Sequence, residues 1–178
     1  MQKVHCEING LTHYYFNKYV NGTPGKSEKA EKEHAVQKVF HDDNGLYFPG
    51  IQIQGCMINA IRFAQMKLGK SMTRPIEFIK STLQKPEEIY FTPKMKLDDI
   101  ELVKERTKVG QGQQEVLREN WYARISTKWG AAFDIEFADL LPTVYIEEAL
   151  RTGGQYNGIG GRRNWQRGRF EVTKFEMV

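Results

Sequence analysis

Strict alternation of apolar and polar side chains between Ala131 and Phe137 is the sequence feature that most constrains the fold. Ala131, Phe133, Ile135 and Phe137 fall on one face, and the residues between them fall on the other. This period of two is typical of a β-strand with one face in a hydrophobic core. The apolar face has to be covered, and we expect helices to cover it.

Further strand patterns recur along the chain. They predict strands at residues 3–8, 89–91, 121–125 and 170–177. In the first, Val4, Cys6 and Ile8 are the expected buried positions. In the last, Phe170 and Val172 are expected on one face, with Phe175 and Met177 on the other.

Two segments carry the three- and four-residue spacing of amphipathic helices. The first is expected to begin near Gly55 and to end at Gly69, and the second to begin at Pro142 and to stop at Gly153. With insertions set aside, the element order is βαββαβ. The sequence therefore predicts an α+β fold of the ferredoxin-like, RNA-recognition type, in one domain spanning residues 1–178.

Two stretches are interpreted as insertions, at about 12–48 and 92–116. The first carries Asp42–Asp43–Asn44–Gly45, a hairpin-turn signal, between expected strands at 36–40 and 46–48. A charged stretch at 26–34 is expected to form a loop or a short helix. The second insertion is polar. It is interpreted either as a disordered excursion or as a protrusion that contacts nucleic acid or a neighbouring subunit.

Composition excludes several classes of protein. The chain has 178 residues, 40% hydrophobic and 27% charged, with a formal net charge of +4. No run is long and apolar enough to span a membrane, and the first residues lack the apolar core of a signal peptide, so we expect a cytoplasmic protein. Two cysteines and four histidines give no zinc signature, and no metal or cofactor is expected. Cys6 and Cys56 are expected to be reduced core residues.

A glycine- and arginine-rich stretch between Gly153 and Phe170 is the strongest functional signal. Glycine lets another backbone come close, arginine presents a donor fork that suits phosphate, and aromatic rings stack on bases. The stretch therefore suits a polyanion, although a mobile basic surface turn would look the same. Its candidate contact residues, apart from the glycines at its start, are Gly158, Gly160, Gly161, Arg162, Arg163, Trp165, Arg167 and Arg169.

The beginning of the first helix is a second candidate anion site. Residues 52–55, Gln-Ile-Gln-Gly, are expected to expose unpaired backbone N–H groups there. Arg62 lies about two turns further along the helix.

Two stretches together resemble a known family. Residues 48–62 run from Phe-Pro-Gly into a glycine-started helix that bears an arginine, and residues 153–170 form a glycine-rich loop before a last strand. In this order and separation they are similar to the RAMP superfamily, the RNA-recognition-fold proteins of CRISPR effector complexes. The likeness is closest to the backbone subunits. In this chain, residues 52–54 replace the hydroxyl-rich turn that precedes the helix glycine in that family.

The resemblance implies a non-catalytic protein of antiviral defence that binds single-stranded RNA, with a guide RNA as the expected strand, and that assembles side by side with copies of itself or other subunits. Single-stranded DNA is not excluded as the partner. By carry-over, the contacts to RNA would come from Gln54, Gly55, Asn59 and Arg62 of the first helix, together with Gly158, Gly160, Gly161 and Arg162 of the loop.

Three other functions stay open. A metal-independent endoribonuclease would need a general base, for which His5, His13, His34 and His41 are candidates, assisted by Tyr14 or Tyr15. Cleavage with Mg²⁺ would use Asp42 or Asp43, although the hairpin turn explains both more simply. A stand-alone, phage-encoded relative with a structural role is the third.

Overall fold

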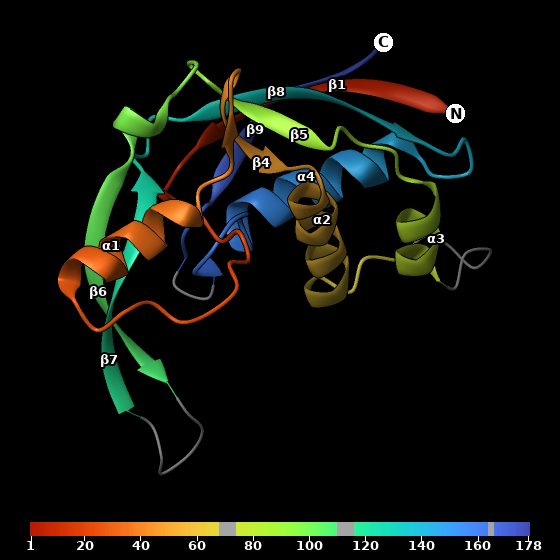
Figure 1. Ribbon diagram of the computed structural model, residues 1–178. Helices are drawn as coiled ribbons and strands as arrows, with labels where there is room; N and C mark the ends of the chain where they lie inside the picture. The colour runs from red at the N-terminus through yellow and green to blue at the C-terminus, as the bar shows by residue number, and fades with distance from the viewer. Residues whose placement is uncertain (68–73, 110–115, 164–165) are drawn as a thin grey trace.

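A six-stranded antiparallel sheet forms the body of the protein in the computed structural model, which describes residues 1–67, 74–109, 116–163 and 166–178 (Figure 1). Its strand order is β3-β4-β5-β8-β1-β9. The strands are β1 Gln2–Gly10, β3 His41–Asp42, β4 Gly45–Pro49, β5 Glu88–Thr92, β8 Gly130–Phe137 and β9 Phe170–Met177.

Three helices accompany this sheet: α2 Ile51–Phe63, α3 Pro75–Thr82 and α4 Thr143–Tyr156. In Figure 1, α2 and α4 lie on the same face of the sheet. The chain passes through β1, α2, β5, β8, α4 and β9, and β8 pairs antiparallel with both β1 and β5. This order in space and along the chain is the βαββαβ arrangement, so the ferredoxin-like prediction is confirmed.

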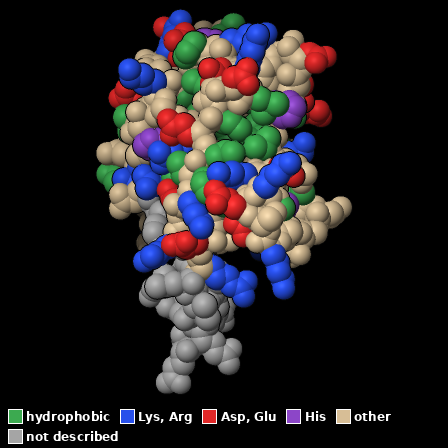
Figure 2. Space-filling view, turned by 60° about the vertical axis from the view of Figure 1, so that its left-hand side comes forward, with side chains coloured by type: hydrophobic (Ala, Val, Ile, Leu, Met, Phe, Trp, Pro, Cys, Tyr) green, Lys and Arg blue, Asp and Glu red, His purple; other side chains and the backbone are tan. Residues whose placement is uncertain are grey.

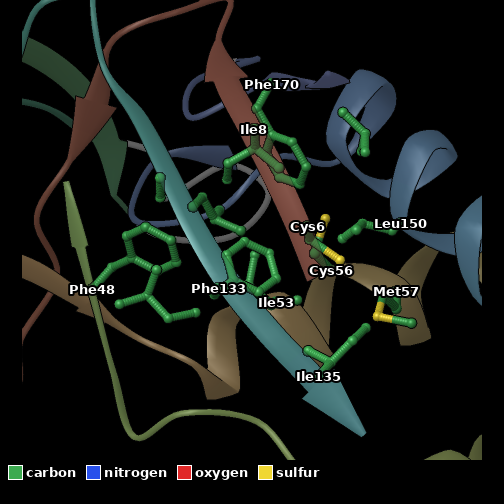
Figure 3. Close-up of a cluster of buried hydrophobic side chains, with 14 of the residues drawn as sticks. Cys6, Ile8, Phe48, Ile53, Cys56, Met57, Phe133, Ile135, Leu150 and Phe170 are labelled. Carbon is green, nitrogen blue, oxygen red and sulfur yellow. The ribbon is translucent and has the colours of Figure 1, made fainter. Parts of the chain in front are cut away.

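The core fills the space between the sheet and these two helices (Figure 3). Cys6, Ile8 and Ile135 point into it from the strands, and Met57 and Leu150 point into it from the helices. All five are at most 1% exposed, as the alternation in the sequence predicts for the strands.

The two cysteines are free and buried in this core. Burial raises the pKa of both the Cys6 and the Cys56 thiol to about 12. Both therefore stay protonated at neutral pH and behave as small apolar side chains.

The predicted orientation of the side chains is wrong for the second half of the last strand. A bulge shifts the β1–β9 register between Glu7 and Ile8, so that Phe175 pairs with Cys6. Directly opposed residues on antiparallel strands share a face, and Phe175 consequently returns to the core side. Simple period-two counting cannot anticipate the extra residue of a bulge.

A second sheet, of order β2-β7-β6, stands beside the first. It is built from β2 Tyr14–Tyr15, β6 Glu101–Val109 and β7 Val116–Ile125, with the 3₁₀ turn η1 Leu97–Asp99 before β6. The long β6–β7 hairpin projects from the body (Figure 1). Residues 101–109, interpreted from their polarity as part of an excursion, thus form a regular strand, on which Glu101, Lys104 and Arg106 are exposed.

Helix α1, Glu28–Gln37, packs on this hairpin. Its N-cap is Ser27, whose hydroxyl accepts a hydrogen bond from the Ala30 N–H at 3.2 Å. The strand predicted from residue 36 is therefore wrong, because the capped helix continues through Val36. Within the described ranges, no helix combines the length and the apolar character needed to cross a bilayer.

Candidate nucleic-acid interface

The glycine- and arginine-rich loop is fixed at both ends by backbone hydrogen bonds. The Gly161 N–H donates to the Tyr15 carbonyl at 2.7 Å, and the Gly168 N–H donates to the His13 carbonyl at 2.8 Å. Between the two arms, the Ile159 N–H donates to the Gly168 carbonyl at 2.9 Å. The described parts of the loop are thus held against β2 and the segment that precedes it, which disfavours the mobile-turn interpretation.

The first two glycines of the stretch belong to α4, which runs past the predicted stop to Tyr156. A Cβ built on Gly153 would lie 2.7 Å from the Cys56 sulfur, and one on Gly154 would lie 2.5 Å from the Phe170 ring. Both glycines therefore allow close packing of α4, against α2 on one side and β9 on the other. The prediction that Gly153 ends the helix is therefore wrong, since this glycine allows close packing and the helix continues past it.

The next two glycines shape the loop from within. Gly158 has φ +70° and Gly160 has φ +79°, and residues that carry a side chain rarely adopt these backbone conformations. Both are buried, Gly158 against the Gly168 backbone and Gly160 against the Tyr14 ring. Their backbones consequently face the protein, and Gly161 is the one predicted glycine contact of this loop that is partly exposed among its described residues.

Arg162 is held inside the protein. Its side chain is 8% exposed, and its Nε lies 3.1 Å from a Glu105 carboxylate oxygen on β6. Its guanidinium also sits 4.5 Å from the centre of the Tyr122 ring. A buried pair of this kind joins the loop to the hairpin, so Arg162 has a positioning role in place of the phosphate contact expected from the sequence.

The same junction contains Tyr15 and Arg124. The Tyr15 hydroxyl donates to Glu105, and the Arg124 Nη1 donates to the Tyr15 hydroxyl at 3.2 Å. Burial, followed by the hydrogen bond to Glu105, raises the pKa of Tyr15. Arg167 stacks over the ring of Tyr15, with its guanidinium 5.8 Å from the ring centre.

The start of α2 does not offer the expected open amide end. The helix begins at Ile51, and a Cβ on the N-cap Gly50 would lie 2.0 Å from the Pro86 carbonyl. Gln54 is 6% exposed, and its amide donates to the Ile79 carbonyl at 3.3 Å. The segment before β5 covers the helix N-terminus, and Gln54 is a core residue that we remove from the candidate interface.

The outward face of α2 is nevertheless open beside the loop. Gly55, Asn59 and Phe63 recur at intervals of four residues, and Arg62 is exposed next to them. No atom lies within 4 Å of a Cβ built on Gly55. From Gly55 to Phe63 this face offers a track about 12 Å long.

A hollow of about 440 Å³ lies where this track meets α4 and the loop. Two aromatic rings line it, Phe63 at 80% exposed and Tyr156 at 62% exposed. Three amide side chains line it as well, those of Asn59, Asn157 and Gln166.

Arg163 and Arg169 supply the positive charge of the hollow. Arg163 is exposed and Arg169 is half-buried, with a backbone N–H that donates to the Thr12 hydroxyl at 2.9 Å. The C-terminal end of α2 presents carbonyl oxygens here, so the cationic side chains provide the attraction for an anion rather than the helix dipole. Trp165 lies outside the described residues.

The outer face of the large sheet is a poor alternative. Directly paired outward positions on β1 and β8 are Lys3 with Glu136 and His5 with Asp134. Lys3 also lies 3.0 Å from Asp134. These two central strands thus present paired charges where RNA-recognition domains place stacking aromatics. On the side that carries α1 and the hairpin, basic and acidic side chains are likewise interspersed (Figure 2).

The hairpin turn explains Asp42. Its Oδ1 accepts hydrogen bonds from the Asn44 and Gly45 N–H groups at 2.7 and 3.1 Å. Its Oδ2 accepts one from the Tyr90 hydroxyl at 2.6 Å, and these bonds lower the pKa of the Asp42 carboxyl. The turn prediction is confirmed, and the described residues bring no group of three His, Cys, Asp or Glu side chains together for a metal ion.

The four histidines lie on four different segments. His5 is on β1, His34 on α1 and His41 on β3, and only His13 adjoins the loop, which it anchors through its carbonyl. Burial, with smaller effects of Arg124 and Arg167, lowers the pKa of the His13 imidazole. It is therefore neutral at pH 7.

Comparison with known proteins addresses the fold. No protein-family model and no curated protein matches the chain. Among solved structures, a chain of Type III-B Cmr-beta bound to cognate target RNA superposes with a TM-score of 0.57 at 14% identity, over 99% of this chain and 60% of that chain. The protein thus spans about 60% of the length of that relative.

Two further structures agree. Cmr6 from Pyrococcus furiosus gives a TM-score of 0.51 at 9% identity, over 95% of this chain and 97% of that one. A chain of a Type IV-B CRISPR complex gives 0.55 at 9% identity, over 98% and 90%. The chain thus shares its fold with these three structures, in agreement with the fold that the resemblance to the RAMP superfamily predicted.

Within this fold, the described candidate residues other than Gly161 fall into two groups. Asn59, Arg163 and Arg169 meet at the hollow, with Gly55 and Arg62 on the adjoining helix face. Those that the structure places inside the protein or over Tyr15 are Gln54, Gly158, Gly160, Arg162 and Arg167.

Three residues of the hollow were not anticipated: Phe63, Asn157 and Gln166. The four-residue step from Asn59 to Phe63 was a readable signal, because it places both on one helical face. The positions of Asn157 and Gln166 depend on where α4 ends and how the loop turns.

Proposed function

We propose that this RAMP-fold protein binds single-stranded RNA as a non-catalytic subunit of a CRISPR-type ribonucleoprotein, in which subunits lie side by side along the strand. The strand would cross the outward face of α2 and the hollow beside it. The observation that carries the proposal is the meeting of Asn59 of α2 with Arg163 and Arg169 of the loop in one polar, aromatic-lined hollow.

The chemistry of the hollow suits a single strand better than a duplex. Exposed rings such as Phe63 and Tyr156 stack on unpaired bases, and arginine forks bind phosphates. Fold neighbours support the biological setting, since two of them are described as bound to target RNA or as a CRISPR complex.

The test is binding of a labelled single-stranded RNA at several salt concentrations in EDTA. If Arg62, Arg163 and Arg169 each neutralise one phosphate, log K should fall against log salt with a slope of about −2. An intact strand after incubation supports a non-catalytic subunit, whereas site-specific cuts would favour the endoribonuclease. Absence of binding at low salt would refute the proposal.

A substitution at Gly55 probes the helix face directly. Gly55→Leu is expected to keep or raise thermal stability, because the Cβ position is open and leucine favours a helix interior by about 0.8 kcal/mol over glycine. RNA affinity should fall about tenfold or more, since the side chain occupies the path of the strand. Gln37→Leu, at an exposed position of α1, is the matched control. Equal affinities of the two variants would move the strand away from α2.

A further inference from the structure

The hollow between the ends of α2 and α4 carries features that phosphate binding alone does not require. Its amide side chains, those of Asn59, Asn157 and Gln166, make no side-chain hydrogen bond within the described part of the chain. An amide group offers both a donor and an acceptor, as the edge of a nucleobase does. A phosphate, by contrast, offers only acceptors, so it would pair with the amide N–H groups and leave the three amide oxygens without a donor.

The rings of the hollow are correspondingly placed for a flat ligand. Phe63 and Tyr156 come from different helices, yet both line the same space and stay largely exposed. Large exposed aromatics next to a concave, polar surface indicate a binding site. At about 440 Å³ the hollow falls within the usual range for small-molecule sites, which suits one base with its sugar.

A backbone outlier adds an independent observation. Gln166 at φ +60° and Arg162 at φ +58° both lie in the left-handed region that most non-glycine residues avoid, and Arg162 is held there by its pairing with Glu105. The chain uses glycine at neighbouring positions of the same kind, at φ +70° for Gly158 and +68° for Gly168. A glutamine kept at such a position, with its amide lining the hollow, points to a role for the side chain.

From these observations we infer that the hollow holds one nucleobase of the bound strand and reads its edge through the amides of Asn59, Asn157 and Gln166. Arg163 and Arg169 hold the flanking phosphates, and Phe63 stacks on the base. The inference rests on the proposed function, and it adds a base preference at one position per subunit.

The experiment compares single-stranded RNAs of equal length: poly(A), poly(C), poly(U) and an abasic ribose-phosphate strand. Wild-type protein is expected to bind its best homopolymer about tenfold more tightly than the abasic strand, because one stacked base is lost. Phe63→Ala should bind both strands alike. Gln166→Gly should equalise the three homopolymers while shifting Tm by less than about 3 °C, because glycine relieves the positive φ.

Gln155→Ala, at an exposed position on α4, is the control and should keep the wild-type preference. Salt-dependent binding of all strands with equal affinity would overturn the base pocket and leave the proposed function in place. Failure of every strand to bind would refute both the base pocket and the proposed function. Binding of nucleoside monophosphates with the same preference, but of no strand, would assign the hollow to a free nucleotide and likewise refute the inference.

Discussion

Replacing Arg163 and Arg169 together by alanine is expected to weaken binding of single-stranded RNA about tenfold or more at low salt. Both arginines line the hollow beside α2, and each would release counterions from one phosphate. The slope of log K against log salt should accordingly become shallower by about 1.4. Fluorescence anisotropy across a salt series measures both quantities.

A matched control removes the same charge from the opposite side of the molecule. Lys3→Ala with Lys174→Ala strips two cations from the outer sheet face, where they pair with Asp134 and Glu7. Affinity should change less than about twofold, because surface pairs of this kind contribute little. A larger loss in this control than in the arginine variant would place the strand on the sheet and overturn the assignment to the hollow.

Gly168→Ala is expected to destabilise the fold by about 3 kcal/mol or more, through steric clash and backbone strain together. A Cβ at this position would lie 1.8 Å from the Ile159 carbonyl oxygen, and φ is +68°. The Ile159 N–H also donates to the Gly168 carbonyl, so the backbone cannot move without breaking that bond. Thermal unfolding should show a Tm lower by about 6–12 °C.

Gly22→Ala separates strain from packing. Gly22 also has a positive φ, +87°, but nothing lies within 4 Å of its Cβ position. Its substitution should cost only about 1–2 kcal/mol. Equal Tm values for the two variants would mean that the loop is not packed against Ile159 as described.

These two predictions assign different tasks to neighbouring residues of one loop. Gly158, Gly160, Gly168 and Arg162 hold the loop in shape, through positive φ, close backbone contacts and the ion pair with Glu105. Arg163, by contrast, is exposed at the hollow. Substituting Arg162 and Arg163 together would consequently mix a structural effect with a binding effect.

Local patterns in the sequence were sufficient for the βαββαβ order of the main sheet but not for the second sheet. The alternation of Val4, Cys6 and Ile8 and that of Ala131 to Phe137 identified the central strand pair, because burial of one sheet face imposes period two. The spacing of apolar residues at intervals of three and four predicted α2, and the residues Asp42–Gly45 predicted the hairpin turn. Residues 101–109 were misassigned because a solvated strand reads as polar sequence. Residues 36–37 were assigned to a strand because the helix that contains them ends just before the apolar residues Val39 and Phe40.

The sequence by itself determined the βαββαβ order and the presence of a cationic, glycine-rich segment before the last strand, because both follow from short-range spacing and residue type. Only the tertiary structure decided which of several chemically alike residues face solvent: Asn59 but not Gln54, and Arg163 but not Arg162. The physical reason is that burial is set by partners distant in the chain, Ile79 for Gln54 and Glu105 for Arg162, whose approach no local pattern records.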